Sequence, residues 1–353
     1  RNAVMTVAHF KKWLRRLCLL GYNMAMLYTE DTYRLKGEDC FGYMRGAYSA
    51  QELRTVDEYA SRLGIEMIGC IQTLGHMEQF LRWSSSKKVK DTERVLLADS
   101  QDTYTLIEKM IRNFKAVFSS RRIHIGMDEA WDLGRGRYLD RNGFQRNFDI
   151  FNNHLKKVID IVKKHELFPM IWSDMYFRMG SDTGGYYDRK SRIPEDVYSE
   201  IPGKVQLVYW DYYHDDQEFY EEWIDRHTAL GHPPIMASGV WTWRVPWYWH
   251  KKTAETVTPC IKACRKKGVD ELFFTLWGDD GGYCDFDTAL AGLTYAAEHC
   301  FRESPDHSEI AERFNGLFSG DYDTVIRVSG INDFCNAASV LWDDPLLGLF
   351  LNT

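Results

Sequence analysis

The stretch that decides the fold is Ser49–Ile71, SAQELRTVDEYASRLGIEMIGCI, in which a helix pattern runs directly into a strand pattern. Ser49 and Glu52 have the spacing of a capping box, in which each side chain accepts a hydrogen bond from the other residue's backbone N–H. Apolar residues then recur at helical spacing, at Leu53, Val56, Tyr59, Ala60 and Leu63. Gly64 is a typical helix stop, and the apolar run Ile65–Ile71 follows at once. The stretch therefore predicts one helix–strand unit.

The same unit recurs along most of the chain. Strand-like apolar runs occur at Met24–Tyr28, Ile65–Ile71, Arg122–Met127, Phe168–Trp172, Val205–Trp210, Ile235–Val240 and Glu271–Leu276. Helical patterns lie between or before them, at Phe10–Leu20, Ser49–Leu63, Thr103–Phe118, Phe148–His165, Glu218–Leu230 and Thr253–Lys267. Strands that alternate with helices and are apolar along their whole length indicate a parallel sheet covered by helices.

Two folds have this alternation, an open doubly wound sheet and a closed barrel. The spacing stays regular over about 250 residues, the usual size of a barrel, and no glycine-rich phosphate loop follows the first strand. We therefore expect a (β/α)8 TIM barrel over residues 1–300 and a helical C-terminal extension, residues 301–353, packed on it. Because only seven strands are found and a helix comes first, strand one is expected upstream of Arg1.

Composition limits the kinds of partner. The chain has 353 residues, a net charge of −7 and a pI near 5.9, which do not indicate nucleic acid or an acidic membrane surface as a partner. Its eight cysteines form no close C-x-x-C pair, so we expect neither disulfides nor a zinc site, and a reducing, cytoplasmic location. An upstream signal peptide, removed from this chain, stays open as an alternative. No apolar run approaches 18 residues, so no transmembrane helix is expected.

The strand RIHIGMDE, residues 122–129, ends in two adjacent carboxylates. Neighbours on a regular strand point to opposite faces, but the backbone turns where a strand ends. Asp128 and Glu129 are therefore both expected to reach the barrel mouth, with Gly126 permitting close packing below. The chain's other Asp-Glu pairs are expected to be solvated: Asp57-Glu58 within a helix and Asp270-Glu271 before a strand.

Tryptophans close several of the strands, and a mouth lined with aromatic rings suits the apolar face of a sugar. Two carboxylates at such a mouth suggest glycoside hydrolysis, although the usual pair flanks the scissile bond from two different strands. Adjacent carboxylates fit a scheme on one side of the sugar. One protonates the leaving oxygen, and the other steers a substrate group that acts as the nucleophile.

The motif His124-x-Gly126-x-Asp128-Glu129 resembles the H-x-G-x-D-E signature of glycoside hydrolase family 20, the β-N-acetylhexosaminidases. Three longer stretches carry the same resemblance: LYTEDTY at 27–33, IQTLGHMEQFLRW at 71–83 and RRIHIGMDEAWDLGRGRY at 121–138. It covers nearly the whole chain and is greatest to single-domain bacterial exo-enzymes related to hexosaminidase D. It implies retaining removal of terminal β-GlcNAc or β-GalNAc, in which the substrate's own acetamido oxygen attacks and forms an oxazolinium ion.

The resemblance also implies roles for the polar residues. Glu129 would act as general acid and then as base, and Asp128 would hold the acetamido N–H. His76 would support the acid, with an acidic partner from Glu30 or Asp31.

The resemblance implies that a further set of residues would bind the sugar. Arg1 would bind the 3- and 4-hydroxyls, and Trp172, Trp210 and Trp277 would line the acetamido pocket. Asp279 stands where the family has a glutamate for the 4- and 6-hydroxyls, which leaves the choice between gluco and galacto sugars open. The family's usual Tyr-x-Asp/Asn is absent, so Tyr212 is expected to supply that hydroxyl, and Trp241 or Trp243 to form a wall of the pocket or of the aglycone site.

Two rival interpretations stay open from the residues alone. A metal-dependent barrel hydrolase or isomerase would gather an ion between strand ends, at His76, Asp128, Asp174 and Asp211. A sugar-binding barrel without catalysis would keep the tryptophans and not need the acid. The preferred interpretation predicts a glycan or glycoconjugate with terminal N-acetylhexosamine as partner, with no cofactor, metal ion, nucleic acid or membrane.

Overall fold

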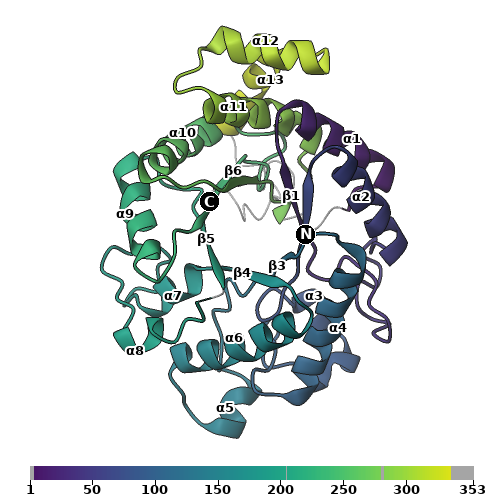
Figure 1. Cartoon of the computed structure of the whole chain (residues 1–353), viewed down its shortest axis with the longest axis vertical. Helices are drawn as coiled ribbons and strands as arrows, with labels where there is room; N and C mark the ends of the chain where they lie inside the picture. Colours follow the sequence, from purple (N-terminus) through teal and green to yellow (C-terminus); the bar gives the residue numbers. More distant parts are fainter. Residues whose placement is uncertain (1–3, 204, 280–281, 335–353) are drawn as a thin grey trace, which may run out of the picture.

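A computed structural model describes residues 4–203, 205–279 and 282–334. Seven parallel strands stand around a common centre and form a nearly closed barrel of the (β/α)8 type, with a ring of helices outside them (Figure 1). In chain order the strands are β1 Met24–Tyr28, β2 Glu66–Cys70, β3 Arg122–His124, β4 Phe168–Trp172, β5 Gln206–Trp210, β6 Ile235–Gly239 and β7 Leu272–Thr275. Each strand pairs with the next, so all their carboxyl ends lie at one end of the barrel.

The main helices of the outer ring are α1 Val7–Leu19, α2 Ala50–Arg62, α4 Gln101–Val117, α6 Asn147–Lys164, α9 Gln217–Thr228, α10 His250–Lys267 and α11 Leu290–Phe301. Shorter helices lie in the connections: α3 Glu78–Leu81, η1 Ser84–Lys88, α5 Arg137–Asn142, α7 Asp174–Met179, α8 Glu195–Tyr198 and η3 Phe286–Ala289. Three elements follow the ring: α12 His307–Phe318, α13 Tyr322–Ser329 and η4 Gly330–Asp333.

The predicted helix–strand unit is present. Ser49 Oγ accepts from the backbone N–H of Glu52 at 3.2 Å, and Glu52 Oε2 accepts from the N–H of Ser49 at 2.7 Å, so the capping box is closed. All seven predicted strands occur within a few residues of their expected ends. The largest difference is β3, which ends at His124 instead of Met127. Its backbone leaves the extended conformation because Gly126 and Met127 have φ of 71° and 75°.

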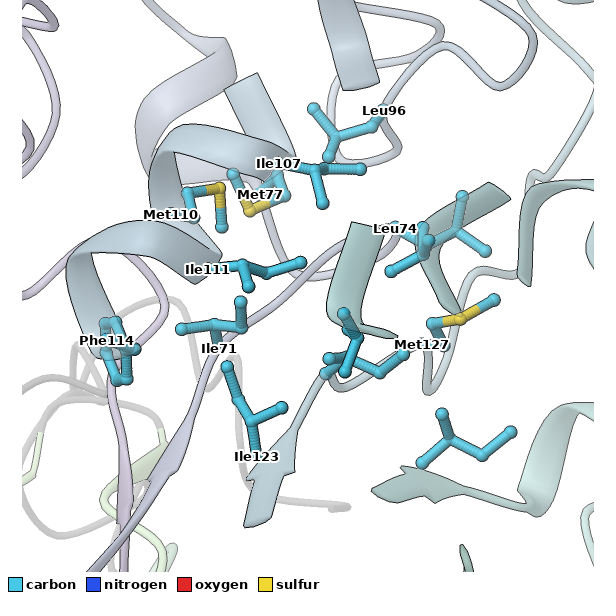
Figure 2. Close-up of a cluster of buried hydrophobic side chains, with 14 of the residues drawn as sticks. Ile71, Leu74, Met77, Leu96, Ile107, Met110, Ile111, Phe114, Ile123 and Met127 are labelled. Carbon is cyan, nitrogen blue, oxygen red and sulfur yellow. The ribbon is translucent and has the colours of Figure 1, made fainter. Parts of the chain in front are cut away.

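Apolar packing holds the helices to the outside of the barrel. Figure 2 shows one such layer, where Ile111 and Phe114 of α4 lie beside Ile71, which follows β2, and Ile123 of β3 belongs to the same cluster. Met127, just after β3, belongs to the same buried cluster as Leu74. This packing anchors the backbone on which the neighbouring Asp128 and Glu129 stand.

At the amino ends of the strands an arginine bridges two strands. Arg122 Nη2 lies 2.6 Å from Glu66 Oε2, and its Nη1 contacts Glu271 Oε2 just before β7. The side chain of Glu271 is still 49% exposed, as expected of a solvated carboxylate. The expectation that Asp57 is solvated is wrong, because its side chain is buried on α2 and accepts from the N–H of Ser119 at 3.1 Å.

The edges of the sheet are β1 and β7, and side chains of both strands and of α1 line an apolar cleft between them. The strand expected upstream of Arg1 lies outside the described residues, as does part of the segment 301–353. Within that segment, α12 packs on α11, and α13 packs on α10 and α11 (Figure 1). The division into a barrel and a C-terminal extension stays a prediction. No helix among the described residues is long and apolar enough to cross a membrane.

Candidate active site

Asp128 and Glu129 meet at the barrel mouth because the chain turns sharply after β3. Glu129 has a φ of 48°, and the backbone around it is closely packed. A Cβ added to Gly126 would lie 2.0 Å from Gln72 Oε1, and one added to Gly75 would lie 2.5 Å from the carbonyl oxygen of Asp128. Both glycines are therefore needed for the close approach of the β2 and β3 ends.

His76 binds both carboxylates with a single nitrogen. Its Nε2 lies 3.2 Å from Asp128 Oδ2 and 3.2 Å from Glu129 Oε2. The His76 side chain is buried, whereas that of Glu129 is 25% exposed. An imidazole therefore lies between the two nearest oxygens of the pair, and both carboxylates lie on one side of the pocket.

The outer oxygens of the pair have donors of their own. Gln72 Nε2 donates to Asp128 Oδ1 at 2.8 Å, and the Tyr186 hydroxyl donates to Glu129 Oε1 at 2.9 Å. Gln72 also accepts from the N–H of Met127 at 3.3 Å, so it links the side chain of Asp128 to the turn that carries it. The orientation of both carboxylates is thus set from β2 and from the segment between α7 and α8.

Asp174, the first residue of α7, lies completely buried next to the pair. Its Oδ2 accepts from the backbone N–H of Glu129 at 3.1 Å, and its Oδ1 accepts from the indole N–H of Trp210 at 3.2 Å. Burial and the negative charge of Asp128 raise the pKa of Asp174 to about 8. Burial acts in the same direction on Asp128, but the charge and hydrogen bond of His76 and the hydrogen bond of Gln72 outweigh it and lower the pKa of Asp128. Asp128 is therefore the ionised member of the two.

Aromatic rings wall the recess beside the carboxylates. Trp172 and Trp277 lie with ring centroids 6.3 Å apart, and Trp277 also meets the edge of Tyr28 at 4.9 Å. Tyr212 stacks on Trp210 at 5.2 Å and forms side-chain hydrogen bonds with Thr275 and Trp277. These rings leave a small space with apolar walls and one acidic side, as a sugar ring with one polar edge requires.

Most of the predicted site residues come together. The recess is lined by His76, Asp128, Glu129, Trp172, Trp210, Tyr212, Trp243, Trp277 and Asp279. Trp241 lies behind this wall, stacked on Trp243 at 4.1 Å, and its side chain is mostly buried.

The acidic pair after β1, Glu30 and Asp31, binds an arginine that was not predicted. Asp31 Oδ1 lies 3.0 Å from Nε of Arg45, and Glu30 Oε2 lies 3.5 Å from its Nη2. A pairing of His76 with Glu30 or Asp31 stays a prediction, beside the contacts of His76 with Asp128 and Glu129. Arg1 lies outside the described residues.

Several contributors were not predicted. Asp174 was considered only as a metal ligand, and Gln72 was given no role, because their contacts with Asp128 and Glu129 have no local signal. Tyr28 and Tyr213 also line the recess. Tyr186 comes from an irregular segment without periodicity, so only the folded structure identifies it as a neighbour of Glu129.

His124, the histidine of the H-x-G-x-D-E motif, is buried and contacts the protein backbone and a tryptophan. His124 Nδ1 accepts from the N–H of Gly126 at 3.1 Å, and its ring packs on Trp172 at 4.5 Å. Burial lowers the pKa of His124 to about 3, so the imidazole is neutral. In the part of the chain that the structure describes, no three His, Cys, Asp or Glu side chains are grouped to hold a metal ion, and the cysteines there form no disulfide.

Comparison with known proteins points to one family. A family model described as "Glycosyl hydrolase family 20, catalytic domain" matches residues 23–240. Hexosaminidase D of Homo sapiens is 26% identical over 232 residues, which are 62% of this chain and 45% of the human protein. Hexosaminidase D of Bos taurus is 26% identical over 205 residues, 55% of each protein. The chain thus spans about half the length of these curated relatives.

Solved structures show the same fold at low sequence identity. The exo-β-N-acetylglucosaminidase of Vibrio harveyi superposes with a TM-score of 0.65 at 13% identity, over 92% of this chain and 57% of the other. The Flavobacterium johnsoniae chitobiase gives a TM-score of 0.63 at 13% identity, over 96% of this chain and 52% of that chain. These likenesses establish the barrel architecture independently of the motif.

Proposed function

The chain belongs to glycosyl hydrolase family 20, and from that premise we propose that it is a retaining exo-β-N-acetylhexosaminidase. Its substrate is a glycan or glycoconjugate with a terminal non-reducing β-GlcNAc or β-GalNAc. One observation carries the proposal. Consecutive carboxylates, Asp128 and Glu129, share His76 at 3.2 Å each beside a wall of tryptophans.

This arrangement supports substrate assistance rather than a protein nucleophile. A protein nucleophile and an acid would lie on opposite sides of the anomeric carbon, whereas these two carboxylates lie on the same imidazole. The acetamido group of the sugar then supplies the missing nucleophile. Its carbonyl oxygen attacks the anomeric carbon, the glycosidic bond breaks, and Glu129 gives its proton to the leaving oxygen.

Asp128 has the complementary task. Ionised and held by His76 and Gln72, it accepts the acetamido N–H and stabilises the positive charge of the oxazolinium ion. In the second step Glu129 takes a proton from water, and that water attacks the anomeric carbon and opens the oxazolinium ring with retention. Tyr212, on the wall of the same recess, is the proposed hydrogen-bond donor to the acetamido oxygen.

The test is hydrolysis of p-nitrophenyl β-GlcNAc and β-GalNAc by the wild type and by Glu129→Gln. We expect turnover of at least one β-glycoside by the wild type. We also expect Glu129→Gln to lose about 10²- to 10⁴-fold on substrates with poor leaving groups, the usual contribution of a general acid. The p-nitrophenyl α-anomers are the matched control and should not be cleaved. A wild type that cleaves neither β-glycoside would overturn the proposal.

A further inference from the structure

A second group of side chains lies against the outer oxygen of Glu129. Tyr186, which donates to Glu129 Oε1 at 2.9 Å, accepts a hydrogen bond from the indole N–H of Trp131. Trp131 is 46% exposed, and two guanidinium groups lie over its ring. The Cζ atom of Arg94 is 4.3 Å from the ring centroid, and that of Arg178 is 5.8 Å from it. We refer to Arg94, Trp131, Arg178 and Tyr186 as the arginine–tryptophan cluster.

The two arginines of the cluster have no carboxylate partner. No Asp or Glu oxygen of the described residues lies within ion-pair distance of either guanidinium, in contrast to Arg45 and Arg122. Arg178 donates to the carbonyl oxygen of Gly184 and stacks on Tyr186 at 5.3 Å. The Nε of Arg94 is buried and has no hydrogen-bond partner among the described residues.

The position of the cluster relative to the reaction follows from the proposed function, on which this inference rests. Asp128 and the tryptophan wall hold the acetamido side of the sugar, and Glu129 protonates the oxygen of the leaving group. Side chains beyond Glu129 Oε1 therefore face the leaving sugar. The cluster is connected to this oxygen through Tyr186 and lies outside the recess itself, whose lining includes none of its four residues.

We propose that the arginine–tryptophan cluster is a subsite for a leaving-group sugar that carries an anion, either the carboxylate of a uronic acid or a sulfate ester. Guanidinium groups bind both anions through paired N–H donors. The ring of Trp131 holds the guanidinium of Arg94 in place and supplies apolar surface for the sugar. The protein then prefers acidic glycans as substrates, although its net charge is −7.

The experiment compares matched disaccharides with the same terminal β-N-acetylhexosamine. One pair has glucuronic acid or glucose as the leaving sugar, and a second has sulfated or unsulfated galactose. The readout is the ratio of kcat/KM for the anionic to the neutral member, so a loss common to both substrates cancels. We expect the wild type to favour an anionic member about tenfold or more, the effect of one to two charge-assisted hydrogen bonds. The pair that shows it identifies the anion.

The variants Arg94→Gln and Arg178→Gln should each lower this ratio, and the double variant should bring it close to one. Arg112→Gln, an exposed arginine on α4, is the matched control and should keep the wild-type ratio. Raising the salt concentration should lower the ratio in the wild type, because ions screen the attraction. A wild-type ratio of one or less for both pairs, or an unchanged ratio in the double variant, would overturn the proposal.

Binding separates this inference from the proposed function. Calorimetry of the same disaccharides with Glu129→Gln measures the preference for the anion without turnover. A protein that hydrolyses no β-N-acetylhexosaminide and yet binds the anionic member about tenfold more tightly would retain the subsite and lose the proposed activity. Equal binding of both members, in a protein that cleaves the aryl glycosides, would retain the proposed activity and overturn the subsite.

Discussion

The side chain of Asp174 binds the backbone of Glu129, with Oδ2 accepting its N–H at 3.1 Å. Glu129 has a φ of 48°, a left-handed conformation that an L-residue adopts only when its surroundings hold it there. The other oxygen of Asp174 holds the indole of Trp210 at 3.2 Å. One buried side chain therefore positions both the proposed acid and a wall of the sugar recess.

Asp174→Asn should lower kcat about 10- to 100-fold, with less effect on KM. The asparagine amide has a single acceptor oxygen, so one of the two N–H groups faces an NH2 group instead of an acceptor. Glu129 then shifts, and small displacements of a catalytic group cost rate. Asp57→Asn is the matched control, because Asp57 is also buried and accepts a backbone N–H but lies on α2. It should lower stability and leave kcat within about twofold. Equal kcat values for Asp174→Asn and the wild type would show that Asp174 has no positioning role.

Asp174 should also make stability depend on pH. In the folded protein it keeps its proton up to about pH 8, because it is buried and faces the charges of Asp128 and Glu129. In the unfolded chain an aspartate loses its proton near pH 4. The folded state therefore binds one more proton between these values. The free energy of unfolding should fall as the pH rises through this range, by at most about 1.4 kcal/mol per pH unit.

Asp174→Asn removes that titration. Urea unfolding at pH 5 and at pH 7.5 should show the variant gaining stability relative to the wild type at the higher pH. If the free energies of unfolding of the variant and the wild type differ by the same amount at both pH values, the raised pKa of Asp174 is contradicted.

The two catalytic carboxylates should differ in their response to the leaving group. Glu129→Gln should recover much of its activity on 2,4-dinitrophenyl glycosides, because a good leaving group needs no proton. Asp128→Asn should remain slow on every leaving group, by about 10²-fold or more, because the acetamide has lost its acceptor. Steady-state rates for a series of aryl glycosides measure both dependences. A parallel response of the two variants would argue against substrate assistance.

Gly126→Ala should abolish most of the activity. Its Cβ would lie 2.0 Å from Gln72 Oε1, and Gln72 holds Asp128, so the turn and the carboxylate must move together. Gly268→Ala provides the control, since Gly268 has a similar φ of 66° in the left-handed region but no atom within 4 Å of the added Cβ. It should cost about 1–2 kcal/mol of stability from the left-handed backbone alone and no activity. Similar kinetics for the two variants would mean that the close approach at Gly126 is not required.

Arg122→Gln should affect stability and not catalysis. Arg122 joins Glu66 and Glu271 at the end of the barrel opposite the mouth, and these side chains are only partly buried. Its loss should cost about 1–2 kcal/mol, more than the loss of Arg146, whose ion pairs are exposed. Thermal unfolding of both variants tests whether the loss of Arg122 costs more stability than the loss of Arg146. The kcat of Arg122→Gln should stay near that of the wild type. A large loss of kcat in Arg122→Gln would show that the two ends of the barrel are coupled.

Part of the site follows from local sequence. The spacing of apolar residues marks each strand, and parallel strands bring their carboxyl ends to one mouth, so the positions of Trp172, Trp210 and Trp277 in the chain already predict that they line it. The end of β3 is predicted less well. Gly126 signals a turn, but the left-handed conformation of Met127 and Glu129 depends on contacts with β2 and α7 rather than on their own side chains.

The sequence by itself determined the alternation of helices and strands, the family and the position of the proposed catalytic pair at the end of β3. These features depend on residues close together in the chain, where spacing and capping act directly. Only the tertiary structure decided which groups bind that pair. His76, Gln72 and Asp174 reach it from more than 40 residues away, through the register of neighbouring strands. Tyr186 reaches it from the segment between α7 and α8, and the arginines beside Trp131 come from a loop and from α7. Their contacts arise from how the connections pack at the mouth, and no local pattern records that packing.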